Sequence, residues 1–291
     1  MSVHAIEDQR PEPGGSRNPE CGHTHTSPTP LLLPEDLRDR RAVVTGAARG
    51  IGEAIAKWLI MAGADVTVVD KDQKSLKLAF GDEPCQILEG DLGADDVVGL
   101  ADDLARHAPV ELIVNNVGVS TRHGFLDIGM PEFDEVLQTN LRGPWFFTRR
   151  LVDAFLDSQR REARRRRHRH GSIVFISSLH DRFVGGQAHY SASKAAVAML
   201  SRELAKQLAP HRIRVNAISP GWVRTAEDTT TREQIEKHAR LWPRIPLGVA
   251  GVPADVARVA VFLLSDAWAG YITGQNIAVD GGLSLHSFVD D

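Results

Sequence analysis

Short runs of β-branched and apolar residues alternate with helical stretches from Arg41 onward. A strand, a helix and a second strand in succession form a parallel sheet that helices cover on both faces. Strands in such a sheet are buried on both sides, and the apolar run Ile173–Ile176 meets that requirement. We therefore predict an α/β fold, a doubly wound parallel sheet of about seven strands in a single domain. The expected strands are Ala42–Thr45, Asp65–Val69, Gln86–Glu89, Leu112–Asn115, Ser172–Ser177, Arg214–Ile218 and Asn276–Val279, and the expected helices are Ile51–Ala62, Asp95–His107, Met130–Leu156, Ala188–Leu208 and Ala254–Leu264.

The composition excludes several classes of protein. Hydrophobic residues make up 42% of the 291 residues, enough to fill a sizeable core. A net charge of −4 demands no nucleic-acid partner, and no apolar run approaches the roughly 20 residues that span a bilayer. The N-terminus has no hydrophobic signal segment, and two cysteines, Cys21 and Cys85, exclude a disulfide scaffold. We expect a cytoplasmic protein with reduced thiols and no membrane contact.

The first 38 residues differ from the rest of the chain. They are rich in proline, glycine and serine and poor in apolar residues, which predicts a disordered tail at 1–38 and a folded domain at 39–291. Cys21, His23 and His25 in this tail have a spacing that could bind a metal. Because no second cluster of ligands stands nearby, a solvated tail is the favoured interpretation.

The segment 160–170 carries seven arginines and stands where such a fold needs only a short connection. Arginines that neutralise phosphates would give a salt-dependent contact with nucleic acid. No aromatic residue stands among these arginines to stack on a base, so a solvated loop is favoured over nucleic-acid binding.

A glycine-rich turn, TGAARGIG at 45–52, joins the first expected strand to the first helix. Its glycines let the backbone approach a pyrophosphate, and the helix N-terminus offers free N–H groups. Asp70 ends the next strand 18 residues after Gly52, near the spacing at which an acid binds the adenine ribose. The turn therefore predicts dinucleotide binding. A carboxylate at Asp70 would repel a 2′-phosphate and favours NAD over NADP, whereas Arg49 and Lys71 are basic residues that favour NADP.

The glycine spacing resembles that of the short-chain dehydrogenase/reductase family, and the resemblance extends from Arg41 to about Leu285. It rests on TGAARGIG, Asp91, NNVG at 115–118, Asn140, the pair Ser177 and Ser178, YSASK at 190–194 and NAISPGWVRT at 216–225. The resemblance implies a Rossmann-type NAD(P)-dependent oxidoreductase that transfers a hydride between the nicotinamide and a secondary alcohol or ketone. It also implies a homo-oligomer, a tetramer or a dimer, assembled through the helices expected at Met130–Leu156 and Ala188–Leu208 and through the C-terminal strand.

Tyr190 and Lys194 stand four residues apart, hence on one face of the expected helix. The resemblance implies that Tyr190 is the general acid–base, that Lys194 lowers its pKa and bonds the nicotinamide ribose, and that Asn140 holds a water of a proton relay. A serine should orient the substrate oxygen. The family's usual spacing between this serine and the tyrosine selects Ser177, whereas the serine's usual position on the strand selects Ser178. We favour Ser178, because loops absorb a deletion more easily than strands shift register.

The resemblance assigns cofactor contacts to the glycine turn, the ends of the next strands, the catalytic helix and the stretch after the sixth strand. These residues are Gly46, Arg49, Gly50, Ile51, Gly52, Asp70, Asp91, Leu92, Asn115, Asn116, Gly118, Tyr190, Lys194, Pro220, Gly221, Val223 and Thr225. Residues 222–251 are expected to form a mobile substrate lid, with a helical insertion around core tryptophans as the alternative.

The segments expected near the substrate, Ser120–Asp127, His180–His189 and the lid, are polar for a steroid or fatty-acyl pocket. They contain Arg122, His123, His180, Asp181, Arg182, His189 and Arg224. We therefore predict a polar hydroxylated substrate, such as a sugar, a cyclitol or a secondary metabolite. Because the two histidines lack a third ligand, we predict no metal. A non-catalytic dinucleotide-binding protein is the alternative, and the full set of Ser, Tyr, Lys and Asn counts against it.

Overall fold

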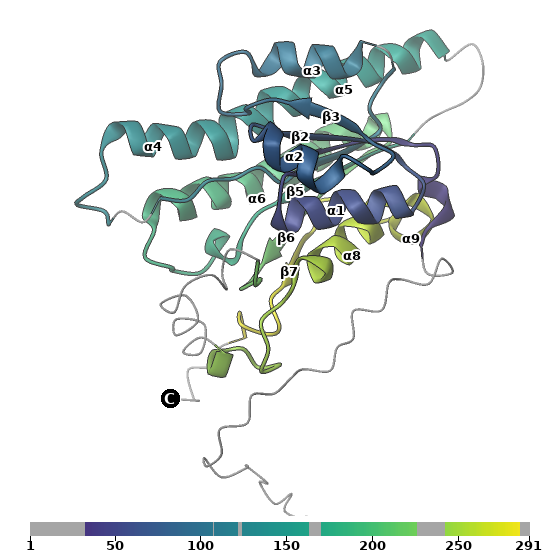
Figure 1. Cartoon of the computed structure of the whole chain (residues 1–291). Helices are drawn as coiled ribbons and strands as arrows, with labels where there is room; N and C mark the ends of the chain where they lie inside the picture. The colour runs from purple at the N-terminus through teal and green to yellow at the C-terminus, as the bar shows by residue number, and fades with distance from the viewer. Residues whose placement is uncertain (1–32, 107, 122–123, 163–169, 226–241, 286–291) are drawn as a thin grey trace, which may run out of the picture.

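The computed structural model describes residues 33–106, 108–121, 124–162, 170–225 and 242–285. Seven parallel strands form one sheet in the order β3-β2-β1-β4-β5-β6-β7, and helices cover both of its faces (Figure 1). The predicted α/β fold with one doubly wound sheet is confirmed. The strands are β1 (Arg41–Thr45), β2 (Asp65–Asp70), β3 (Gln86–Glu89), β4 (Leu112–Asn115), β5 (Gly171–Ile176), β6 (Ile213–Pro220) and β7 (Asn276–Val279).

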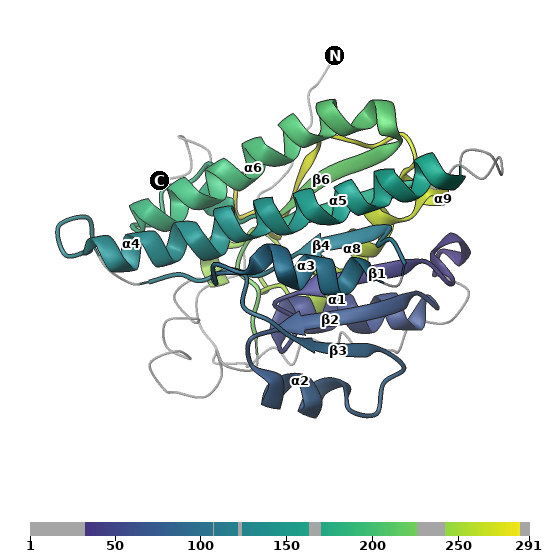
Figure 2. The same cartoon turned by 90° about the horizontal axis from the view of Figure 1, so that it is seen from above.

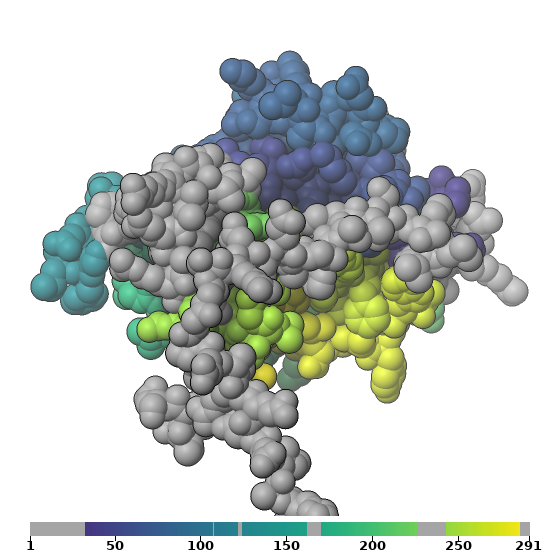
Figure 3. All heavy atoms as spheres, turned by 60° about the horizontal axis from the view of Figure 1, so that its bottom comes forward, coloured from purple at the N-terminus to yellow at the C-terminus, as the bar shows by residue number. Residues whose placement is uncertain are grey.

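Two hydrophobic cores lie on either side of this sheet. One packs α1 (Gly50–Met61), α2 (Gln73–Phe80) and α8 (Pro253–Leu264) against it, and the other packs α3 (Val97–Ala105), α5 (Gly143–Glu162) and α6 (Ala188–Leu208). Figure 2 shows the latter three helices together over one face of the strands. Segments from the two ends of the chain share the other side: α1 packs on α8, and Figure 3 shows the purple and yellow residues on one visible surface.

The strands β4 to β6 are buried along their whole length. All four residues of β4 and all eight of β6 are buried, as a parallel sheet with two covered faces requires. The observed bounds of β3, β4, β7 and α6 equal the predicted ones. Pro220 belongs to β6 and pairs with Val279, so it does not follow the strand as predicted.

Helix α2 was not predicted. Asp72 caps it by accepting a hydrogen bond from the Ser75 N–H at 3.0 Å, and Leu76 and Phe80 bury one face four residues apart. A short helix, α9 (Asp266–Ala269), was also missed. The predicted helix Asp95–His107 begins later, at Val97, because Asp96 caps it through the Gly99 N–H.

The long helix predicted at Met130–Leu156 is three segments. Helix α4 (Met130–Leu137) leads into a π-helical turn, Gln138–Arg142, and α5 then continues to Glu162. The predicted arginine loop therefore begins inside a helix, since Arg160 and Arg161 belong to α5. The rest of that loop, residues 163–169, lies outside the described residues.

The predicted boundary of the tail at residue 38 is wrong by several residues. Leu37 is fully buried, and the Asp36 carboxylate accepts hydrogen bonds from the Ser265 hydroxyl and from the N–H groups of Asp266 and Ala267. The folded part thus includes residues 33–38. Residues 1–32, with Cys21, His23 and His25, lie outside the described residues.

An ionic network closes the edge of the sheet where the strands begin. The buried Arg214 guanidinium donates to the carbonyls of Leu263, Leu264 and Ser265 and lies 2.9 Å from an Asp266 carboxylate oxygen. Arg40 donates to the other oxygen of Asp266 at 3.1 Å. These arginines pair the end of α8 with the starts of β1 and β6.

None of the helices in the described ranges is both long enough and apolar enough to cross a membrane.

Candidate active site

The glycine turn lies at the opposite edge, where the strands end. Gly46 and Gly50 have φ angles of +63° and +62°, which favour glycine over residues with a side chain. A Cβ on Gly52 would lie 2.1 Å from the Gly46 carbonyl oxygen, so only glycine fits there. The Asn116 side chain, at the end of β4, donates to the carbonyls of Thr45 and Gly46 at 3.1 and 2.8 Å. The turn is therefore a rigid backbone cradle at the start of α1.

Asp70 ends β2 beside this cradle. One of its carboxylate oxygens accepts the Ala48 N–H at 3.1 Å, and the other accepts the Asp72 N–H at 3.0 Å. Each oxygen keeps further acceptor capacity, because an ionised carboxylate has about four lone-pair sites. The side chain is thus fixed in place and can still accept hydrogen bonds from a diol.

The two cations on either side of Asp70 each lie beside another carboxylate. The Arg49 guanidinium is 3.9 Å from Asp72, and the Lys71 ammonium is 4.0 Å from Asp91. All four of these side chains are substantially exposed to solvent, so the pairs are weak. Both cations border the same cleft as Asp70.

A cleft of about 360 Å³ joins these groups. Of the predicted cofactor residues it brings together Gly46, Arg49, Gly50, Ile51, Asp70, Asp91, Leu92, Asn116, Gly118 and Thr225. Gly52, Asn115, Tyr190, Lys194, Pro220, Gly221 and Val223 do not line it. It is also lined by Glu53, Lys71, Gly90, Val117, Val119 and Thr139; apart from Lys71, these were not predicted, and their only sequence signal is adjacency to the motifs.

Gly118 connects this cleft to the predicted catalytic residues. A Cβ on Gly118 would lie 3.1 Å from the Lys194 ammonium nitrogen and 3.5 Å from the Asn140 carboxamide oxygen. The glycine therefore leaves room between the cleft and α6, which carries Tyr190 and Lys194.

Tyr190 and Lys194 lie one turn apart on α6. The Lys194 ammonium donates to the Ile176 carbonyl at 2.9 Å and lies 5.8 Å from the centroid of the Tyr190 ring. Burial lowers the pKa of Lys194 to about 8. Burial raises the pKa of Tyr190, and a hydrogen bond with Ser178 acts in the opposite direction. The predicted lowering of the tyrosine pKa by Lys194 thus has to overcome desolvation in the protein without a cofactor.

The two candidate serines have different surroundings. The buried Ser177 hydroxyl donates to the Lys194 carbonyl at 3.0 Å, which ties the end of β5 to α6. Ser178 shares a hydrogen bond with Tyr190, and its hydroxyl oxygen accepts the His180 N–H at 3.2 Å. Ser178 is therefore the serine that adjoins the tyrosine hydroxyl.

Asn140 is buried in the π-helical turn. Its carboxamide oxygen accepts the Val119 N–H at 2.7 Å, and its amide nitrogen donates to the Val119 carbonyl at 2.9 Å and to the Ser193 hydroxyl at 3.0 Å. The side chain thus fixes the loop after β4 against α6. Its predicted part in a water relay stays a prediction.

Polar contacts surround the approach to Tyr190. The imidazole of His189 bonds the hydroxyl and the carbonyl of Thr121, and Ser120 donates to Gln187 at 2.5 Å. The His180 ring lies edge-on to the Tyr190 ring at 5.2 Å. Two segments of the chain therefore meet through hydrogen-bonding groups rather than apolar ones.

The predicted lid is held at its two ends. Val223 and Gly251 form a parallel bridge, and the Arg224 N–H donates to the Gly251 carbonyl at 2.8 Å. Residues 226–241 of the lid and the predicted substrate residues Arg122 and His123 lie outside the described residues. Over the ranges that the structure covers, no three His, Cys, Asp or Glu side chains gather as metal ligands.

Comparison with known proteins places these features in context. A family model described as enoyl-(acyl carrier protein) reductase matches residues 46–284. A 3-oxoacyl-[acyl-carrier-protein] reductase of Aquifex aeolicus is 33% identical over 263 residues, 85% of this chain and 98% of its own. An L-rhamnose 1-dehydrogenase (NAD(P)(+)) of Azotobacter vinelandii is 34% identical over 263 residues, 86% and 98% of the two chains. The crystal structure of a proposed NAD(P)-dependent gluconate 5-dehydrogenase from Beutenbergia cavernae, with bound NADP, has a TM-score of 0.77 and is 36% identical. The match covers 87% of this chain and 100% of the other chain.

Proposed function

Because the chain belongs to the short-chain dehydrogenase/reductase family, and so is an NAD(P)-dependent oxidoreductase acting on CH–OH or keto groups, we propose that it transfers a hydride between NAD and a polar secondary alcohol or its ketone. The observation that carries this proposal is the pairing of two sites. The rigid glycine cradle with Asp70 fits a dinucleotide, and the Ser178–Tyr190–Lys194 group adjoins it across Gly118.

The residues divide the chemistry among them. When bound, the nicotinamide accepts or returns the hydride. Tyr190 takes the proton of the substrate hydroxyl, or returns it to the ketone. Ser178 donates a hydrogen bond to the substrate oxygen and opposes the charge that develops there. The Lys194 cation favours the tyrosinate, which the burial of Tyr190 otherwise disfavours.

The preference for NAD rests on the fixed Asp70 carboxylate. Two backbone N–H groups hold it at the cleft, so it cannot turn away from a 2′-phosphate without breaking them. Arg49 and Lys71 could attract that phosphate, but each already lies beside Asp72 or Asp91. NADP is the second candidate cofactor, because two similar structures carry it and one similar enzyme is named for both NAD and NADP.

A polar substrate is supported by the groups near Tyr190. His180, Gln187 and His189 come from one segment, and Ser120 and Thr121 from the loop that faces it. Such groups hydrogen-bond hydroxyls and give little apolar area to a long acyl chain or a steroid. The sugar and sugar-acid dehydrogenases among the similar proteins agree with this class.

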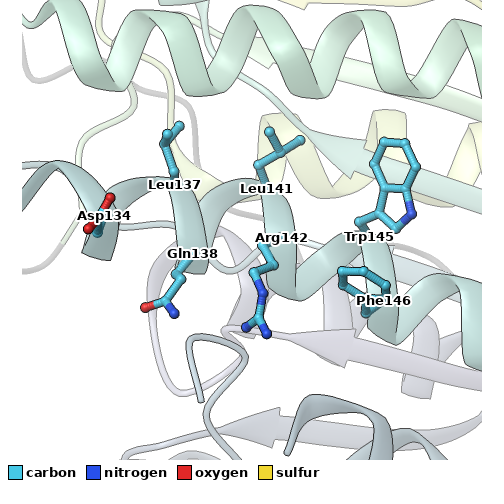
Figure 4. Close-up of a pocket in the computed structure, with 7 residues that line it drawn as sticks. All are labelled: Asp134, Leu137, Gln138, Leu141, Arg142, Trp145 and Phe146. Carbon is cyan, nitrogen blue, oxygen red and sulfur yellow. The ribbon is translucent and has the colours of Figure 1, made fainter. Parts of the chain in front are cut away.

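We also propose a homo-oligomer that uses the surface hollow shown in Figure 4. The hollow runs along α4, the π-helical turn and α5, and is lined by Asp134, Leu137, Gln138, Leu141, Arg142, Trp145 and Phe146. Trp145 and Phe146 are 47% and 37% exposed, a large aromatic surface to leave in water. We expect Trp145→Glu to lower the mass measured by light scattering, whereas Leu78→Glu, on the well-exposed face of α2, leaves it unchanged.

The deciding experiment is a 340 nm assay with NAD and NADP in parallel against sugars, cyclitols and secondary alcohols. The matched variants are Tyr190→Phe and Tyr271→Phe, because the chain has two tyrosines and Tyr271 is fully exposed. We expect turnover that is faster with NAD, lost in Tyr190→Phe and kept in Tyr271→Phe. Turnover of bulky apolar ketones alone would contradict the polar substrate, and equal kcat/KM with NADP would contradict the NAD preference.

A further inference from the structure

Asp181 carries a buried carboxylate close to the proposed site and has no part in the chemistry above. It ends the short 3-10 turn Leu179–Asp181, which begins directly after Ser178. Its side chain is 1% exposed, although an ionised carboxylate is rarely buried without compensation. Asp181 stands three residues after Ser178, so this cost of burial falls close to the partner of Tyr190.

The carboxylate is compensated by donors from β6 and β7 and by the neighbouring Arg182. One oxygen accepts the Ser219 hydroxyl at 2.5 Å and the Asn276 amide at 2.6 Å, while the Ser177 hydroxyl, which donates to the Lys194 carbonyl, lies 3.3 Å from it. The other accepts the Arg182 guanidinium at 2.8 Å. Burial alone would raise the pKa of Asp181, but the hydrogen bonds from Arg182, Ser219 and Asn276 hold it below its ordinary value. The group is therefore an anion at neutral pH.

The two strand donors lie on β6 and β7, and the turn itself follows β5. Ser219 stands one residue before Pro220, which ends β6, and Asn276 begins β7. One carboxylate thus ties the turn after β5 to the adjacent strand β6 and to β7, the strand beyond it.

The turn that Asp181 ends is also the turn that orients Ser178. The Ser178 hydroxyl oxygen accepts the His180 N–H at 3.2 Å, and the Ser178 carbonyl accepts the Asp181 N–H at 2.9 Å. A shift of the turn therefore moves Ser178 relative to Tyr190, which stands on a separate helix.

We propose that Asp181 is a positioning residue: its buried carboxylate anchors the Leu179–Asp181 turn to β6 and β7 and so holds Ser178 against Tyr190. This inference rests on the proposed function, because the proposed function is what assigns Ser178 to the substrate oxygen. The inference predicts that Asp181 affects turnover only through the position of Ser178.

The test is a double-mutant cycle of Asp181→Asn and Ser178→Ala. In the otherwise unchanged protein we expect Asp181→Asn to lower kcat by about tenfold or more, since a displacement near 1 Å costs that much, with KM for NAD within about twofold. In the Ser178→Ala protein the same change should lower kcat by less than about twofold. Equal losses in both backgrounds would overturn the proposal, because a merely structural role gives additive losses.

Asp36→Asn is the matched control. Asp36 is also a carboxylate with three protein donors, but it lies at the other edge of the sheet. We expect it to lower the thermal midpoint and leave kcat within about twofold. If Asp181→Asn does not fold, Ser219→Ala removes a single donor, and a smaller loss of kcat that also vanishes without Ser178 supports the same conclusion.

Crystal structures of the unchanged protein and of Asp181→Asn separate this inference from the proposed function. If no alcohol or ketone is turned over, the proposed function fails, and the structures still decide the inference. We expect the Ser178 hydroxyl to leave Tyr190 in the variant; an unmoved Ser178 would overturn the anchoring role.

Discussion

A buried cation lies at each of two opposite edges of the sheet, and the two cations have different partners. At the edge where the strands begin, Arg214 is matched by the Asp266 carboxylate and by three carbonyls at the end of α8. At the edge where the strands end, Lys194 donates to one carbonyl, and burial is the one cause of its pKa shift. The first charge is balanced within the described part of the protein, and the second is not.

The difference separates stability from function. A buried charge with a full set of partners holds elements together, and its removal leaves those partners unpaired. A buried charge with few partners costs free energy of folding and is available to a ligand. An effect of Arg214 on catalysis, or of Lys194 on stability, would contradict this division.

The largest expected effect is at Lys194. We expect Lys194→Met to lower kcat/KM by about 10³-fold, because the cation that favours the tyrosinate is lost. The free energy of unfolding should change by less than about 1 kcal/mol, since the relief of a desolvated charge offsets the lost bond to Ile176. Steady-state assays and urea denaturation measure both. A stable fold with more than a tenth of the activity would contradict the role of the lysine.

The reverse pattern is expected at Arg214. Arg214→Met leaves Asp266 and the α8 carbonyls without their donor, and we expect the free energy of unfolding to fall by about 3 kcal/mol. At 20 °C kcat/KM should stay within about twofold, because the network lies at the edge away from Tyr190. Urea denaturation followed by circular dichroism measures the loss; a fall in kcat without a fall in stability would contradict the structural role of Arg214.

Sequence patterns predicted the fold best where the information is local. The predicted bounds of β3, β4, β7 and α6 are correct to the residue. The π-helical turn could not be predicted, because it depends on Asn140 bonding Val119, 21 residues earlier in the chain. The anchoring of Asp36 to Ser265 depends on an even longer separation, and so the tail boundary was misplaced.

The candidate site divides in the same way. The glycine turn, Tyr190 and Lys194 could be predicted as site residues because their chemistry follows from spacing along one turn or one helix. The choice between Ser177 and Ser178 needed the position of Tyr190, which spacing along the chain does not give. Asp181 was noted as one polar residue among several, since its partners Ser219 and Asn276 come from other strands.

A smaller effect is expected at Asp70, which lies at the edge where the strands end. Asp70→Asn removes the negative charge and keeps one acceptor, so we expect the ratio of kcat/KM for NAD to that for NADP to fall by about twentyfold. Asp91→Asn is the control, because Asp91 lines the same cleft beside Lys71. It should change the ratio by less than about threefold. An unchanged ratio in Asp70→Asn would remove the basis for the NAD preference.

The smallest expected effect comes from the titration of Lys194. As pH rises, NADH binding should weaken while the folded state becomes more stable. Lys194 has a pKa of about 8 in the folded protein and an ordinary value of 10.5, so its cation is present below pH 8 and is lost above it. We expect the Kd for NADH, followed by fluorescence, to rise about fivefold from pH 7 to 9.5 as the charged donor to the ribose disappears. Between pH 8 and 10.5 the unfolded chain binds the extra proton, so this group makes the folded state more stable as pH rises.

Lys194→Met is the control for both trends. Its Kd for NADH should be flat over the same range, and its stability should lack the rise. A wild-type Kd that does not change, or that changes equally in the variant, would assign the titration to another group.

The π-helical turn at Gln138–Arg142 gives the chain one residue more than an uninterrupted α-helix would use there. Each residue rotates an α-helix by about 100°, so deleting one here would turn α4 by that angle relative to α5. The deletion would then either withdraw Asn140 from Val119 or rotate Leu137 out of line with Trp145. The number of residues in this turn therefore couples the candidate site around Asn140 to the outer surface around Trp145. A related protein that lacks one residue here should differ in one of these two places.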